Sequence, residues 1–233
     1  MMILLIAGVL PALLLIRYIY KQDTIEHEPT GLLVKLFIAG GLTTFAASVL
    51  ERIGVSILNG VFQNSENMTL YMILLNFIVV GISEEGVKHF ALRRITWYDD
   101  NFNFRFDAVL YSAVVALGFA AFENVLYILN FGLGVAPIRA VTAIPMHCIC
   151  GIFMGHYYGQ SKLCEQRHNW SAMKYNNIMS MLIPVLLHGF YDFAASSEDE
   201  LMATLFFAYV VIVDIFAFYS VKRYSKNDIG LWE

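Results

Sequence analysis

The chain has 233 residues, of which 58% are apolar and only 15% are charged, and its formal net charge is −4. Its mean hydropathy is +0.62. Soluble domains carry about 25% charged residues, so a soluble globule of this composition would leave much apolar surface in water. The composition excludes a cytosolic enzyme, a disordered regulator and a nucleic-acid-binding protein. Three cysteines without a Cys-x-x-Cys pair favour neither a disulfide framework nor a zinc ribbon. We therefore expect an integral membrane protein embedded in the lipid bilayer.

Seven apolar segments have about the 20 residues that a helix needs to cross the hydrocarbon core of a bilayer. They cover residues 2–20, 31–50, 68–92, 108–130, 136–159, 175–195 and 201–221. Polar stretches separate them, and none resembles a separate soluble domain. The sequence thus predicts a single transmembrane domain over residues 1–233, an all-α polytopic helix bundle. The polar stretch 51–67 leaves room for a short interfacial helix.

The basic residues predict the orientation of these spans. No positive segment precedes residues 2–20 and no small-residue cleavage site follows them, so we expect a retained helix with an outside N-terminus. Thirteen of the 15 Lys and Arg then fall on the inner side, and Arg52 and Arg139 fall outside. Cytoplasmic loops are enriched in Lys and Arg. We therefore expect a cytoplasmic C-terminus and a multi-pass protein of the cell membrane.

Two adjacent carboxylates lie in the third apolar segment. At about 100° per residue of a helix, Glu84 lies about 40° from Lys88 and Glu85 about 60° from it, so one ammonium can reach both carboxylates. One protonated and one ionised carboxyl group side by side suit acid–base hydrolysis. The alternative is a solvated pair at the cytoplasmic end of the helix.

Further ionisable residues lie at membrane depth, where such side chains usually mark a functional site. Glu123 and its neighbour Asn124 lie inside the fourth segment, too far from either end to reach water. His147 lies in the fifth segment. His188 and Asp192 lie in the sixth at a spacing of four residues, so the carboxylate can orient the imidazole.

Two other features of the apolar segments are expected to be structural and not part of the reaction site. Asp214 in the last segment has no polar neighbour, and we expect a structural hydrogen bond there. Gly151, Gly155 and Gly159 form a stripe of small residues that lets another helix approach closely.

The order of these motifs resembles the PrsW family of intramembrane proteases. The chain carries Glu-Glu-x-x-Lys at 84–88, Phe-x-x-x-Glu-Asn-Val-Leu-Tyr at 119–127, His147, and His-Gly-x-Tyr-Asp at 188–192. The segment His27–Leu33 adds to the likeness, which covers nearly the whole chain. The family is related to a wider group of glutamate-type intramembrane proteases.

The resemblance implies a function and a set of residues. It implies site-1 cleavage of a single-span membrane protein, an anti-sigma factor, which starts the release of a sigma factor under envelope stress. Functional residues carried over from the matching motifs are Glu84, Glu85, Lys88, Glu123, His147 and His188, with Asn124 and Asp192 in support.

We expect water-mediated peptide hydrolysis without an acyl-enzyme, since no Ser or Cys is placed as an activated nucleophile. Glu85 or Glu84 is then the general base, and His188 polarises the carbonyl or protonates the leaving amine. Asn124 is the expected oxyanion donor. We favour a site without a cofactor. The alternative is zinc held by His147, His188 and either Glu85 or Glu123.

A transporter or channel is the competing function, because intramembrane Glu and His also form proton relays. The candidate site residues are also expected at different depths in the membrane. If the helices are straight and upright, Glu84 lies about 10 Å from the level of Glu123 and His188 at 1.5 Å per residue. We therefore expect a tilt or a helix irregularity near Gly81 and Gly86.

Overall fold

The computed structural model describes residues 2–197 and 199–232. Within these residues the fold is helical, and an isolated bridge between Phe104 and Gly230 is its one β-type pairing. The elements are α1 (Met2–Tyr20), α2 (Thr30–Phe62), α3 (Met68–Ile73), the π-helix η1 (Leu74–Gly81), α4 (Ile82–Thr96), α5 (Arg105–Phe131), the 3₁₀ turn η2 (Leu133–Val135), α6 (Ala136–Val141), α7 (Ala143–Gln166), α8 (Trp170–Ala195) and α9 (Glu200–Lys226). The predicted all-α bundle is confirmed.

Six helical stretches are long and apolar enough to cross a membrane. They are Thr30–Phe62, Met68–Thr96, Arg105–Phe131, Leu133–Gln166, Trp170–Ala195 and Glu200–Lys226. Each contains one of the segments expected from the sequence. The first expected segment forms α1, whose 19 residues extend about 28 Å at 1.5 Å per residue.

Two boundaries differ from the prediction. The stretch 51–67 is not a separate interfacial helix, because α2 continues without a break to Phe62. This part of α2 contains no proline, and its apolar residues Ile53, Ile57 and Val61 are exposed towards the surroundings. The segment 136–159 is instead broken at Thr142, so that α6 and α7 are separate helices.

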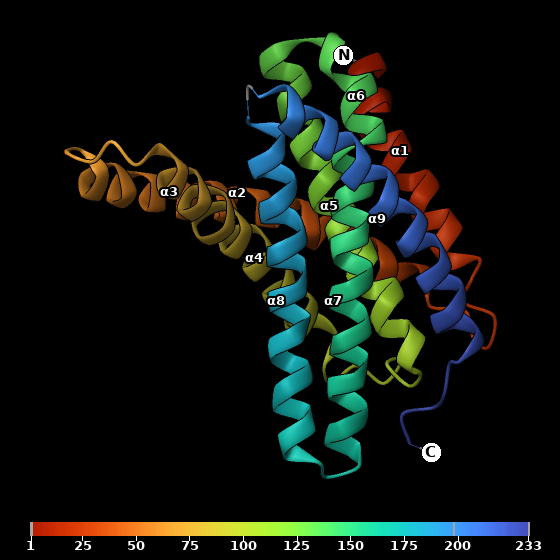
Figure 1. The fold of residues 1–233 in the computed structure, drawn as a ribbon. Coiled ribbons are helices and arrows are strands. Elements are labelled where there is room, and N and C mark those ends of the chain that lie inside the picture. The colour runs from red at the N-terminus through yellow and green to blue at the C-terminus, as the bar shows by residue number, and fades with distance from the viewer. Residues whose placement is uncertain (1, 198, 233) are drawn as a thin grey trace.

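Helix α5 lies at the centre of the fold, and its residues from Phe106 to Ala121 are all buried. Figure 1 shows α7 and α8 running beside each other, whereas α2 and the α3–α4 stretch reach out sideways from them. The predicted glycine stripe is confirmed as a packing surface. A Cβ on Gly155 would lie 2.4 Å from the carbonyl oxygen of Ala108 on α5.

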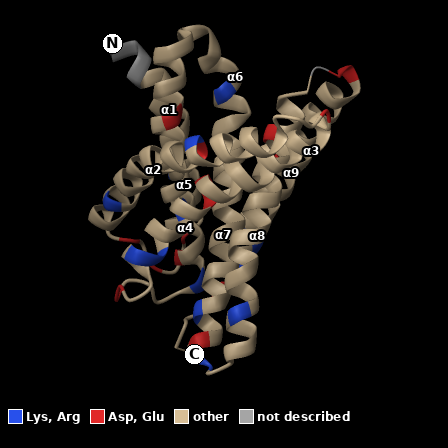
Figure 2. Cartoon of the chain, turned by 90° about the vertical axis from the view of Figure 1, so that its left-hand side faces the viewer, with Lys and Arg blue, Asp and Glu red and all other residues tan. Residues whose placement is uncertain are grey.

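The ends of the bundle differ in charge. Most Lys and Arg residues lie towards the end at which the C-terminus is marked in Figure 2. This end carries the α7–α8 turn with Lys162, Arg167 and Lys174 nearby, and it is the side predicted to be cytoplasmic.

The expected irregularity before the carboxylate pair is present. Residues Leu74–Gly81 form a π-helix, which ends where α4 begins. Within it, Asn76 is buried and donates a hydrogen bond to the carbonyl oxygen of Met72, 2.8 Å away. π-Helical segments are rare in proteins, and those that do occur are often found at functional sites. The wide turn and the oblique course of α3–α4 bring the first turn of α4 to α7 and α8.

Candidate active site

The Glu-Glu-x-x-Lys motif occupies the first turns of α4. Nζ of Lys88 lies 3.0 Å from Oε2 of Glu84 and 2.8 Å from Oε1 of Glu85. All three residues are buried, and Glu85 is fully inaccessible. The prediction that one ammonium reaches both carboxylates is confirmed.

His188 on α8 joins this pair from the opposite side. Its Nδ1 lies 2.7 Å from Oε1 of Glu85, and its Nε2 lies 3.3 Å from Oδ2 of Asp192. Carboxylate oxygens without a proton can only accept hydrogen bonds. An imidazolium therefore satisfies both neighbours at once, and Asp192 orients the ring as the sequence spacing predicts.

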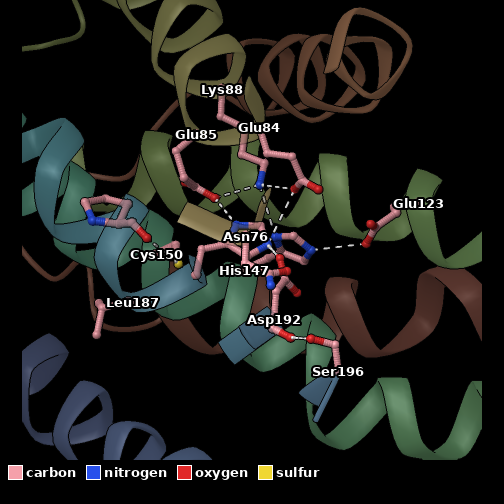
Figure 3. A network of polar contacts seen from close by, with 12 residues as sticks. Asn76, Glu84, Glu85, Lys88, Glu123, His147, Cys150, Leu187, Asp192 and Ser196 are labelled. Carbon is pink, nitrogen blue, oxygen red and sulfur yellow. Dashed lines mark hydrogen bonds and ion pairs between the residues drawn. The ribbon is translucent and has the colours of Figure 1, made fainter. Parts of the chain in front are cut away.

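His147 on α7 completes the cluster (Figure 3). Its Nδ1 lies 3.1 Å from Nζ of Lys88 and its Nε2 lies 3.2 Å from Oε2 of Glu123. Its ring meets that of His188 edge to face, with the ring centres 5.0 Å apart. The structure thus brings together residues from α4, α5, α7 and α8 that are up to 108 positions apart, from Glu84 to Asp192.

Arg139 is a member of the site that sequence reasoning missed. Its guanidinium lies 2.5 Å from Oε2 of Glu123, donates to Oδ1 of Asn124 at 3.1 Å and stacks over Tyr127. The sequence predicts Arg139 on the outer side, with no part in the site. One feature of the sequence could have pointed to it: Arg139 and Arg52 are the two basic residues on the side predicted to be outside.

Asn124 lies at the edge of the site and faces another helix. Its amide nitrogen donates a hydrogen bond to the carbonyl oxygen of Gly8 on α1, 3.3 Å away. The residue is fully buried. This contact engages the amide that the sequence suggested as an oxyanion donor, and it ties α1 to α5.

A cavity of about 400 Å³ adjoins the cluster. Its walls include Glu84, Glu123, His147, His188 and Asp192. It extends to Arg139 and Ser196, at the ends of the helices on the predicted outer side. Glu85 is not among its lining residues, so the two adjacent carboxylates differ in their access to water.

Asp214 lies apart from this cluster. It lines a separate apolar pocket between α1, α7 and α9, together with Leu15, Pro145 and Phe218. The structural hydrogen bond expected at Asp214 is not seen within the described residues, and its side chain lies in an apolar pocket instead.

Comparison with known proteins connects this geometry to a family. The model of the "PrsW family intramembrane metalloprotease" matches residues 28–219. The chain belongs to the PrsW family. It is 32% identical to Protease PrsW of Oceanobacillus iheyensis, over 98% of this chain and 99% of that protein. It is 29% identical to Protease PrsW of Bacillus subtilis, over 80% of each chain. No solved structure matches the chain significantly.

Membership of the PrsW family makes the chain an intramembrane peptidase and a multi-pass membrane protein. It therefore favours the peptidase over the transporter or channel that the sequence left open. The motifs that suggested the PrsW resemblance are those whose side chains form the buried cluster.

The description of the PrsW family also implies a metal ion. The carboxylates and imidazoles of the cluster are side chains of the kind that bind such an ion. Glu84, Glu85, His147 and His188 each offer a ligand atom, and these atoms lie within 4.8 Å of one another. Oε2 of Glu85 is buried and has no hydrogen-bond partner. Lys88, however, contacts Glu84, Glu85 and His147, so an ion and this ammonium would share the same ligands.

Proposed function

We propose that the chain makes the site-1 cut in a membrane-anchored anti-sigma factor of the cell membrane during envelope stress. The reaction is peptide hydrolysis by a water molecule, with intramembrane Glu and His side chains as acid and base. The resemblance of the four motifs to those of the PrsW family supports an anti-sigma factor as the substrate. The cavity beside the buried carboxylates supports the chemistry.

The proposal rests on the different access of the two adjacent carboxylates to the cavity. Glu84 lines the cavity, whereas Glu85 is fully buried behind it. We assign the general base to Glu84, which takes a proton from water in the cavity while that water attacks the scissile carbonyl carbon. Glu85 positions Lys88 and His188.

His188 is the second catalytic group. It lines the same cavity as Glu84, and its two ring nitrogens face Glu85 and Asp192. A protonated imidazole in this place polarises the carbonyl oxygen and then gives its proton to the leaving amine. Glu85 holds the ring through Nδ1, and the substrate takes the place of Asp192 at Nε2, whose longer contact of 3.3 Å is the weaker of the two.

The metal-dependent reaction is the second candidate, favoured by the four clustered ligand residues. Glu84, Glu85, His147 and His188 would hold the ion, which would activate water and polarise the carbonyl. Glu123 and Asp192 would then orient the two imidazoles, as carboxylates do for metal-bound histidines.

The test uses purified protein in liposomes with a candidate single-span substrate. We expect Glu84→Gln to lower the cleavage rate at least about 100-fold, as for loss of a general base, and Glu85→Gln and His188→Ala to abolish cleavage as well. Asp214→Asn is the matched control, since it makes the same carboxyl-to-amide change within the bundle and should be mild. Full cleavage by Glu84→Gln and His188→Ala would contradict the proposed chemistry.

A further inference from the structure

A second group of buried carboxylates lies on the side predicted to be cytoplasmic. Asp23 follows α1, Glu28 precedes α2, and Asp107 lies in the first turn of α5. Their exposed fractions are 2%, 3% and 1%. Each offers one oxygen, and the three oxygens lie within 4.8 Å of one another.

Two of the carboxylates are incompletely bonded. Oδ2 of Asp23 and Oδ1 of Asp107 are buried without a hydrogen-bond partner. The other oxygen of Asp107 accepts from the backbone N–H groups of Asn103 and Phe104, and Glu28 accepts from the hydroxyl of Tyr111. Buried oxygens of this kind cost free energy unless something binds them.

The group also lacks a compensating side-chain cation. None of the ion pairs within the described part of the chain involves Asp23, Glu28 or Asp107. Burial disfavours the ionised form of a carboxyl group, so a bound cation would offset the cost of placing three carboxylates together in the interior.

We propose that Asp23, Glu28 and Asp107 bind a hard divalent cation, Ca²⁺ or Mg²⁺. Both ions prefer carboxylate oxygens, and three oxygens this close together fit around an ion at the roughly 2.0–2.6 Å distances of such bonds. The ion takes up the two unpartnered oxygens and joins the 21–29 connection to the start of α5.

This site is separate from the peptidase cluster and does not depend on the proposed function. Asp107 and Glu123 both lie on α5, 16 residues apart, which is about 24 Å at 1.5 Å per residue. The donors also differ, since this group consists of oxygen ligands whereas the peptidase cluster includes two imidazoles.

Thermal unfolding of the purified full chain in detergent tests the site. After removal of cations by a chelator, added Ca²⁺ or Mg²⁺ should raise the Tm by several degrees, with the size of the shift following the cation concentration. Parallel titrations with the two ions identify the preferred one. Asp23→Asn should lose the shift.

Two variants control this experiment. Glu26→Gln removes a charge from the same connection, and its amide oxygen can still accept from Asn103, which lies 3.0 Å from Glu26. Glu84→Gln changes the peptidase cluster. Both should keep the cation-dependent shift. An unchanged Tm with both ions, or an undiminished shift in Asp23→Asn, would overturn the proposal.

If Asp23→Asn does not fold, Tb³⁺ replaces the variant as the reporter, because it binds at Ca²⁺ sites and emits when a nearby tyrosine is excited. Tyr111, which contacts Glu28, is the expected sensitiser. We expect Tb³⁺ emission that excess Ca²⁺ displaces and that Tyr111→Phe reduces severalfold, whereas the exposed-residue variant Tyr98→Phe leaves it unchanged. Equal emission from both variants would contradict the site.

Discussion

Nζ of Lys88 lies 3.1 Å from Nδ1 of His147, on a helix 59 residues away in the sequence. An ammonium donates hydrogen bonds and cannot accept them. Nδ1 is therefore the acceptor, and in the neutral ring the proton is on Nε2, which faces Glu123. A single lysine thus holds the two adjacent carboxylates together and fixes the tautomer of His147.

The first prediction follows from this position. Lys88→Met leaves Glu84 and Glu85 buried beside each other without their cation. Breaking a buried ion pair in this way costs about 3–5 kcal/mol, so we expect a lower Tm together with loss of cleavage. Lys226→Met at the exposed end of α9 should change neither. Wild-type cleavage by Lys88→Met would show that the ammonium is dispensable.

Local geometry made part of this site predictable. Contacts at three and four residues within one helix depend on helix geometry alone, so the sequence correctly paired Lys88 with both carboxylates and His188 with Asp192. Contacts between helices depend on tilt and register. Straight, upright helices at 1.5 Å per residue would leave Glu84 about 10 Å from the level of Glu123 and His188. The π-helix and the oblique course of α3–α4 remove this gap (Figure 1).

Tertiary packing also explains what the sequence missed. Arg139 reaches Glu123 because the chain breaks at Thr142 and α6 forms a separate short helix. Asn124 looked like part of a reaction site because it follows Glu123, but one residue on a helix turns a side chain by about 100°. Its amide therefore faces Gly8 on α1.

The second prediction concerns Arg139 as a positioning residue. Arg139→Met removes the cation that holds Glu123, and Glu123 in turn contacts His147. We expect kcat to fall about tenfold or more, as for a misplaced catalytic group, with KM changing less. Arg139→Lys should restore part of the rate, because lysine supplies the charge without the planar fork. Arg52→Met on the exposed part of α2 should behave as wild type.

The third prediction concerns the crossing of α2 and α5. A Cβ on Gly118 would lie 2.1 Å from the carbonyl oxygen of Phe37, so the two backbones would have to separate. We expect Gly118→Ala to destabilise the protein by about 1–3 kcal/mol or more. Gly60→Ala is the control, since nothing lies within 4 Å of its Cβ. Helix propensity predicts that this control stabilises by up to about 1 kcal/mol. Equal Tm values for the two variants would contradict the close crossing.

The fourth prediction separates the two mechanisms by zinc removal. If Glu84 is the general base without a metal, cleavage should survive a nitrogen-donor chelator that prefers transition metals to Ca²⁺ and Mg²⁺. Elemental analysis should then find zinc well below one equivalent. Tightly bound zinc that is lost together with activity in His147→Ala would establish the metal-dependent reaction instead.

The fifth prediction is that the cut lies on the extracytoplasmic side of the substrate, close to its membrane boundary. His188 lies seven residues from the end of α8 at Ala195 and 18 from its start at Trp170, or about 10 Å and 27 Å along the helix. His147 lies four residues from the start of α7. The cavity reaches Arg139 and Ser196 on this same side, so the shorter path for water leads outward.

Mass spectrometry of the two cleavage fragments decides this prediction, since their new termini mark the cut. Reporter fusions supply the orientation on which it depends: a cytoplasm-dependent reporter should be active after Lys226 and inactive at Ser197. A reporter that is active at Ser197 and inactive after Lys226 would exchange the cytoplasmic and outer sides of the protein. Termini that map to the cytoplasmic flank of the substrate, with the reporters as expected, would refute an outward-facing site even though proteolysis itself was confirmed.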